Sequence, residues 1–160
     1  MANKDVPTLE QVKSVFPEIE ALNKPKAIIE CYENIACNPC STSCPFNAIT
    51  IGENINNLPI VDFNKCTGCG ICVYGCPGLA IIVSRIKENK ALYKIPYELL
   101  PYPIVGEVWN AINRSGEVIG DAVIERVDQA PKQDKTLLVH VIVNVDLLYE
   151  FVTIRRKEDE

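Results

Sequence analysis

The chain has 160 residues, 48% hydrophobic and 23% charged, with a formal net charge of −5. This composition excludes global disorder, and the negative charge argues against nucleic acid as the main partner. Eight cysteines without an apolar segment at the N-terminus indicate reduced, metal-binding thiols rather than secreted disulfides. We therefore expect a cytoplasmic compartment. We also expect no direct insertion into a membrane, because the apolar run at 79–83 is too short.

Residues 1–25 are expected to form a helical extension. Thr8 and Gln11 have the spacing of a capping box. One helical face follows, made of Leu9, Val12, Val15 and Phe16. Pro17 ends this helix, and a second short helix is expected over 18–22. Packing of this extension on its own domain is preferred over a clasp on a partner.

Two cysteine-rich runs dominate residues 26–84. The second, Cys66 to Pro77, has the spacing Cys-x2-Cys-x2-Cys-x3-Cys-Pro. In iron–sulfur proteins with this spacing, the fourth Cys ligates the other of two clusters. The first run repeats the pattern with an offset of 32 residues, as between Cys37 and Cys69. The repeat fails at residue 34, which is Asn, and the nearest spare thiol is Cys31.

Short strands flank both runs and extend the duplication. Apolar, partly β-branched residues predict strands at 27–29, 48–51 and 80–83. Pro59 makes 58–62 an edge strand, because proline cannot donate to a ladder. Each copy therefore consists of a ligand loop, one helical turn and a strand.

Thiolate sulfur suits the open coordination site of each iron in a cubane. Three closely spaced cysteines can hold one cluster, while the cysteine before each proline reaches the other. The expected ligands of cluster 1 are Cys31, Cys37, Cys40 and Cys76. The expected ligands of cluster 2 are Cys44, Cys66, Cys69 and Cys72.

Three alternatives remain open. Asn34 or water could replace Cys31 at cluster 1, or cluster 1 could be a three-iron species with Cys31 as a bystander. The third is a zinc site, because Cys-x2-Cys pairs also bind zinc, although a compact run closed by Cys-Pro and given twice is typical of iron–sulfur proteins.

The two runs differ in the residues between their cysteines. Glycines in the second run let backbone N–H groups approach sulfur; they are Gly68, Gly70, Gly75 and Gly78. The first run has Ser41 to Ser43 instead. We expect the two clusters to differ in reduction potential, with a sign that the sequence leaves open.

The remainder of the chain is expected to form a packed, proline-rich linker at 85–103, an antiparallel β domain at 104–154 and a charged tail at 155–160. Strands are predicted at 105–112, 118–127 and 136–145, with a further strand or short helix in 147–154. The third strand has one apolar face, made of Leu137, Val139, Val141, Val143 and Val145. Both His140 and Trp109 are interpreted as structural. No phosphate-binding loop or dinucleotide fingerprint occurs, so no catalytic residues are predicted.

Residues 27–84 resemble the dicluster bacterial ferredoxin family, which implies an α+β fold with a ferredoxin-like core and two 4Fe-4S clusters. The stretch 29–40 reads IECYENIACNPC. With Cys44-Pro45-Phe46, and less specifically residues 106–108 and 115–118, it resembles the small ferredoxin-like subunits of multi-subunit, flavin-dependent amino-acid dehydrogenases of the proline or hydroxyproline type. That resemblance implies that Cys31 belongs to the cluster set.

The expected function is that of an electron-transfer subunit in a hetero-oligomer with flavoprotein dehydrogenase subunits that carry FAD or FMN. About 100 residues outside the cluster region support this interpretation, since a free carrier does not require them. The alternatives are a free ferredoxin electron carrier and a zinc-binding interaction module.

Overall fold

The computed structural model describes residues 6–31, 37, 39–54, 57–76, 79–129 and 136–157. The helices are α1 (Leu9–Val15), α2 (Pro39–Ser43) and α3 (Ile71–Gly75), with 3-10 helices η1 (Ile19–Asn23) and η3 (Val145–Leu147). The strands are β1 (Lys26–Ile29), β2 (Ile49–Thr50), β3 (Ile60–Val61), β4 (Ile81–Lys87), β5 (Lys90–Tyr97), β6 (Val108–Asn113), β7 (Val118–Asp128), β8 (Leu137–Asn144) and β9 (Phe151–Arg155). In the described part of the chain, no helix is long and apolar enough to cross a membrane.

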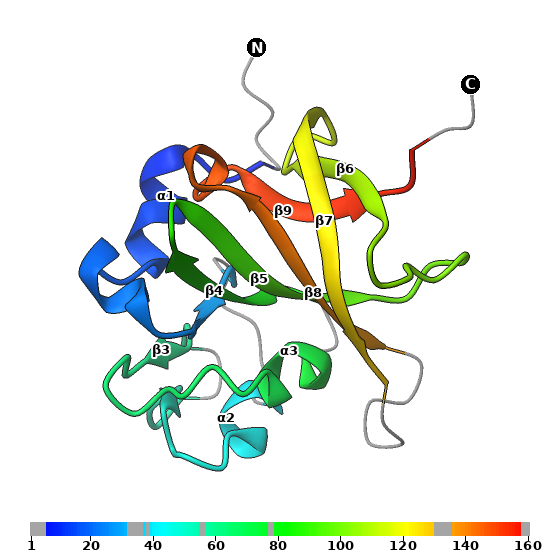
Figure 1. The fold of residues 1–160 in the computed structure, drawn as a ribbon. Coiled ribbons are helices and arrows are strands. Elements are labelled where there is room, and N and C mark those ends of the chain that lie inside the picture. The colour runs from blue at the N-terminus through cyan, green and yellow to red at the C-terminus, as the bar shows by residue number, and fades with distance from the viewer. Residues whose placement is uncertain are drawn as a thin grey trace.

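One antiparallel sheet connects the cysteine-rich region to the rest of the chain. Its strand order is β1-β4-β5-β8-β7-β6-β9, and β2 pairs with β3 in a separate ribbon. The strand β4, which follows the second cysteine run, pairs with β1 on one side and β5 on the other. In Figure 1, α2 and α3 lie at the bottom of the view, and the strands β6 and β9 of the sheet lie at the top.

The prediction of a linker at 85–103 is wrong for most of its length. Residues 85–87 complete β4, and β5 pairs with β8 along its whole length. The proline count concealed an alternating pattern, in which every second side chain of β5 is buried: Ala91, Tyr93, Ile95 and Tyr97. Burial of this face outweighs the one N–H that Pro96 removes from the ladder. The four strands that follow therefore belong to the same sheet and do not form a separate one.

The predicted strands after residue 104 are present with shifted ends, as β6, β7 and β8. The ambiguous stretch 147–154 contains β9, which follows η3. Val145 lies in η3, whereas the rest of the predicted apolar face of β8 is buried. Trp109 is 2% exposed and lies in the core, as its structural interpretation required. Of the predicted tail, Arg155 ends β9, and 158–160 lie outside the described residues.

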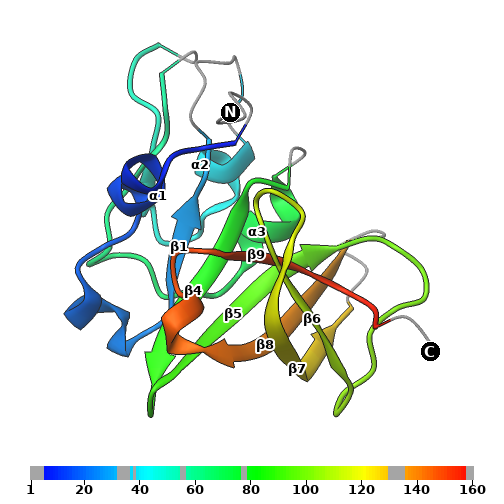
Figure 2. The same cartoon turned by 90° about the horizontal axis from the view of Figure 1, so that it is seen from above.

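The curled sheet has one face on its own core and the other on the cysteine-rich region. Figure 2 shows β9 crossing β4 and β5. There the ring of Phe151 packs on that of Tyr93, tilted by 38° and with 4.6 Å between centroids. Alternate residues of β1 divide between the faces: Ile28 joins this core, while Ala27 and Ile29 pack toward the cysteines. The loops of the two cysteine-rich runs thus pack against strands that also form the main core.

The N-terminal extension packs on the same core. Gln11 N donates to Thr8 Oγ1 at 3.2 Å, and Thr8 N donates to Gln11 Oε1 at 2.9 Å, which completes the predicted capping box. Val12, Phe16 and Leu22 are buried in the core of the sheet. Leu9, which was predicted on the same face, is 55% exposed, so the chain itself covers only part of that face.

A nearly buried ion pair closes the curled sheet beside the first cysteine. Glu30 follows β1, and Arg114 lies in the β6–β7 turn; their side chains are 12% and 9% exposed. Two N–H groups of Arg114 donate to the Glu30 carboxylate, and a third contact reaches Tyr149 O at 2.6 Å. This network holds the end of β1, immediately before Cys31, against the opposite edge of the sheet.

Candidate metal centre

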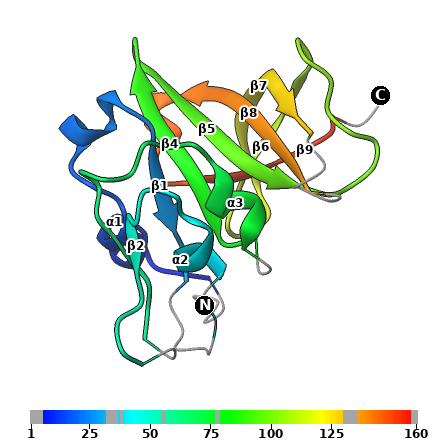
Figure 3. The same cartoon turned by 90° about the horizontal axis from the view of Figure 1, so that it is seen from below.

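The duplicated sequence folds into duplicated structure. Helix α2 spans residues 39–43 and α3 spans 71–75, so both ends of α3 lie 32 residues after the corresponding ends of α2. The turn after each Cys-Pro repeats a left-handed residue, Asn47 at φ 53° and Leu79 at φ 52°. Asn tolerates this conformation, whereas for Leu it costs free energy that the surrounding turn must supply. Figure 3 shows α2 and α3 side by side on the sheet.

The ladders beside the helices follow the same symmetry. The pair Ile29–Ile81 of β1 and β4 maps by the offset onto the pair Val61–Ile49 of β3 and β2. The hydrogen bond that extends each ribbon is also repeated. Glu30 N donates to Ala80 O at 2.8 Å, and Asp62 N donates to Ala48 O at 2.7 Å. The two copies are thus related by a pseudo-twofold swap.

The thiols gather into two neighbourhoods. Burial raises the pKa of the Cys40 thiol; the Ser41 backbone N–H opposes this, and the nearby thiols of Cys76, Cys37 and Cys31 raise the pKa further. Burial also raises the pKa of Cys72 to about 12, with contributions from Cys66, Cys69, Cys44 and Cys40. The neighbours of Cys40 are thiols expected at cluster 1, whereas those of Cys72 are the thiols expected at cluster 2 together with Cys40.

This donor chemistry fits iron–sulfur clusters. A metal ligand must be a thiolate, and several thiolates packed together repel one another unless a cationic core neutralises them. Burial first, and the neighbouring thiols after it, raise the pKa of Cys40 and Cys72 in the protein alone. The eight cysteines supply the ligand count for two cubanes.

The position of Cys31 is consistent with a role at cluster 1. It is half-buried after β1, and its charge affects Cys40. The rival at this position, Asn34, lies outside the described residues, as does the loop 32–36.

The second cysteine loop lies directly on the sheet. Gly68 has φ +71°, and a Cβ there would lie 2.4 Å from Pro25 Cβ. Gly70 has φ +86°, and a Cβ there would lie 2.8 Å from Leu138 Cδ2. Gly68 therefore requires glycine for conformation and for close approach, whereas Gly70 requires it for conformation, because the Leu138 methyl group can move aside. Of the other two expected glycines, Gly75 lies in α3, and Gly78 is outside the described residues.

Three groups missed by the sequence analysis bind this loop. Lys26 Nζ donates to Phe63 O at 2.5 Å and to Cys66 O at 2.9 Å. Ala27 N donates to Cys66 Sγ at 3.2 Å. Lys94 Nζ donates to Gly68 O at 2.7 Å. The one signal in the sequence was Lys26, a lysine at the start of an apolar strand. Lys94 was missed because it lies in the stretch that was predicted to be a linker.

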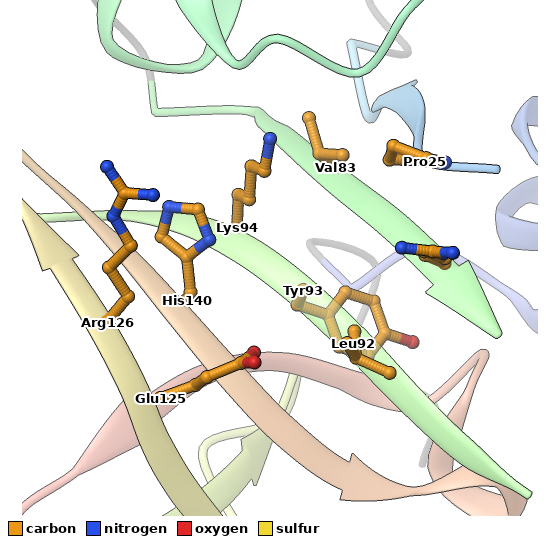
Figure 4. Close-up of a pocket in the computed structure, with 9 residues that line it drawn as sticks. Pro25, Val83, Leu92, Tyr93, Lys94, Glu125, Arg126 and His140 are labelled. Carbon is orange, nitrogen blue, oxygen red and sulfur yellow. The ribbon is translucent and has the colours of Figure 1, made fainter. Parts of the chain in front are cut away.

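A mainly cationic cleft adjoins the loop. Figure 4 shows Lys94, Arg126 and His140 converging on this cleft of about 420 Å³ from β5, β7 and β8, with Glu125 nearby. His140 Nε2 lies 2.8 Å from Asp128 Oδ2, which supports its structural interpretation. Burial lowers the pKa of Lys94, and the Cys69 thiolate acts in the opposite direction.

Comparison with known proteins identifies the cysteine-rich region. Residues 35–80 match the family model of the 4Fe-4S dicluster domain. This region is a 4Fe-4S dicluster domain. It binds two 4Fe-4S clusters, as the sequence predicted. Seven of the cysteines fall inside the matched dicluster domain, and Cys31 lies before it.

Relatives of the dicluster domain include the ferredoxin-type protein NapF of Haemophilus influenzae, 41% identical over 35% of this chain and 33% of that protein. The polyferredoxin-like subunit of aliphatic sulfonate oxidoreductase from Pyrococcus furiosus is 34% identical over 48% of this chain and 39% of its own length. A sulfite dehydrogenase subunit from Allochromatium vinosum is 36% identical over 39% of this chain and 24% of its own length. The matches thus span well under half of each relative, and no solved structure matches the chain.

Proposed function

We propose that this chain is an electron-transfer iron–sulfur subunit of a hetero-oligomeric oxidoreductase. The observation that carries the proposal is the pair of thiol neighbourhoods, related by a pseudo-twofold and built on one side of a sheet whose strands after β4 carry no cysteine. Relatives named as subunits of sulfonate oxidoreductase and sulfite dehydrogenase support it.

When bound, two 4Fe-4S clusters accept and release single electrons. The protein's part is to hold two thiol sets next to each other, since Cys40 and Cys72 belong to different sets yet lie close enough to affect the pKa of Cys72. Such an arrangement suits a flavin in the partner. A flavin takes two electrons from a substrate, and a pair of one-electron centres accepts them from it one at a time. The partner subunits are therefore proposed to carry FAD or FMN.

The proposed class of complex is a flavin-dependent amino-acid dehydrogenase of the proline or hydroxyproline type. The supporting feature is the IECYENIACNPC stretch at 29–40. Substrate oxidation is assigned to the partner. The reduced thiols that both clusters need support a cytoplasmic location.

The proposed ligands are Cys31, Cys37, Cys40 and Cys76 for cluster 1 and Cys44, Cys66, Cys69 and Cys72 for cluster 2. The first of these is tested by Cys31→Ala. We expect this variant to lose iron from the wild-type value of about eight per chain, with a changed cluster 1 EPR signal. Unchanged iron and an unchanged signal would remove Cys31 from the set and leave Asn34 or water at that site.

Purification from the native source, with mass-spectrometric identification of bound proteins, tests the complex. The proposal expects a flavoprotein with a dehydrogenase sequence in fixed stoichiometry with this chain. Recovery of a monomer that carries its clusters and no flavoprotein would instead establish the free ferredoxin alternative. Salt-sensitive, reversible reduction by several unrelated partners would support that alternative as well.

A further inference from the structure

The pseudo-twofold swap allows each polar group at cluster 2 to be compared with its counterpart at cluster 1. The offset of 32 residues places Lys26 opposite Leu58 and Ala27 opposite Pro59, because β1 and β3 coincide at Ile28–Ile29 and Ile60–Val61. The two halves match in backbone and differ in these side chains. Lys26 and Ala27 are therefore polar features that the chain provides beside cluster 2 and lacks at the matching positions beside cluster 1.

The first difference is a hydrogen bond to ligand sulfur. Ala27 N donates to Cys66 Sγ at 3.2 Å. At the counterpart position, Pro59 has no N–H and cannot donate. An N–H aimed at a ligand sulfur stabilises the additional negative charge of a reduced cluster.

The second difference is fixed positive charge. Lys26 is 9% exposed, and its ammonium group binds the backbone oxygens of Phe63 and Cys66. Its counterpart Leu58 is uncharged. Lys94 adds a second cation on the same loop through Gly68 O at 2.7 Å. Because Lys26 is buried and Lys94 is half-buried, salt screens these charges less than it screens exposed surface charges.

The carboxylates near the two clusters do not reverse this difference. Near cluster 1, Glu30 is neutralised by Arg114 in a nearly buried pair. Its counterpart Asp62 lies near cluster 2 but is exposed to solvent, where its field is screened. Asp128 and Arg126, which both act on Lys94, oppose each other. Lys26 and Lys94 therefore favour extra negative charge at cluster 2.

We infer that Lys26, Lys94 and the Ala27 N–H raise the reduction potential of cluster 2 above that of cluster 1. An electron added to the fully oxidised protein then rests at cluster 2. This difference in reduction potential needs no partner protein, only the two bound clusters. The direction of electron flow that follows from it rests on the proposed function: the electron donor approaches cluster 1, and the acceptor takes electrons from cluster 2.

The test is a reductive titration of the cluster-loaded protein, monitored by EPR, in the wild type and in Lys94→Met. The wild type should show two midpoint potentials. In Lys94→Met the higher one should fall while the lower one stays in place. The matched control is Lys90→Met, which removes the same charge from the exposed start of the same strand and should move neither.

Lys26→Met should lower the same potential. If its loss of loop contacts prevents iron incorporation, Lys94→Met still decides the inference. A fall in the lower potential, or a shift no larger than that of Lys90→Met, would overturn it. These potentials are measurable whether or not a flavoprotein co-purifies, so this inference and the proposed function fail separately.

Discussion

At the scale of single residues, spacing along the chain carried most of the information on the metal centre. The thiols that act on Cys40 are those that the sequence grouped with it, and those that act on Cys72 are its expected partners together with Cys40. Cysteine spacing reflects the short reach of a loop around a cluster. Lys26 and Lys94 escaped prediction because their partners are backbone oxygens 40 and 26 positions away. Such contacts follow from tertiary approach and leave no local pattern.

Gly68→Ala tests how closely the second loop approaches the sheet. The substitution combines a left-handed φ with a contact of 2.4 Å to Pro25 Cβ, so we expect a loss of unfolding free energy of about 2–4 kcal/mol and lower iron content. Gly116→Ala is the matched control, with φ +83° and nothing within 4 Å. It should cost only about 1–2 kcal/mol and leave iron unchanged. Equal costs in chemical denaturation would contradict the proposed close approach.

At the scale of elements, the pattern of period two was a better guide than proline content. It predicted β6, β7 and β8, and it was present in Ala91, Tyr93, Ile95 and Tyr97, where prolines led instead to a predicted linker. Which strands pair could not be derived, since β1 and β4 are separated by the whole cysteine-rich region. The closure of the sheet by Glu30 and Arg114, 84 positions apart, likewise had no sequence signal.

Arg114→Met tests this closure. It leaves the Glu30 carboxylate nearly buried without its cation, so the free energy of unfolding should fall by about 3–5 kcal/mol. The surface pair Lys157–Asp121, 46% and 64% exposed, provides the control. Lys157→Met should cost at most about 1 kcal/mol. The double variant Glu30→Gln with Arg114→Met should recover part of the loss, and a loss in Arg114→Met no greater than in Lys157→Met would refute the assigned role.

At the scale of the whole molecule, the dicluster domain and the later strands share one sheet. A chain truncated after residue 84 keeps all eight cysteines. It loses Lys94, Leu138 and β5, which is one of the two strands that pair with β4. We expect it to incorporate less iron than the full chain under the same reconstitution, and to lose it faster in air. Equal iron content and equal lifetime would show that 26–84 holds its clusters without the later strands.

The most direct test of the account is the metal content of the purified full chain together with its reduced EPR spectrum. We predict about eight iron and about eight acid-labile sulfide per chain, with signals from two interacting reduced clusters. Zinc without sulfide, and no signal after reduction, would contradict it.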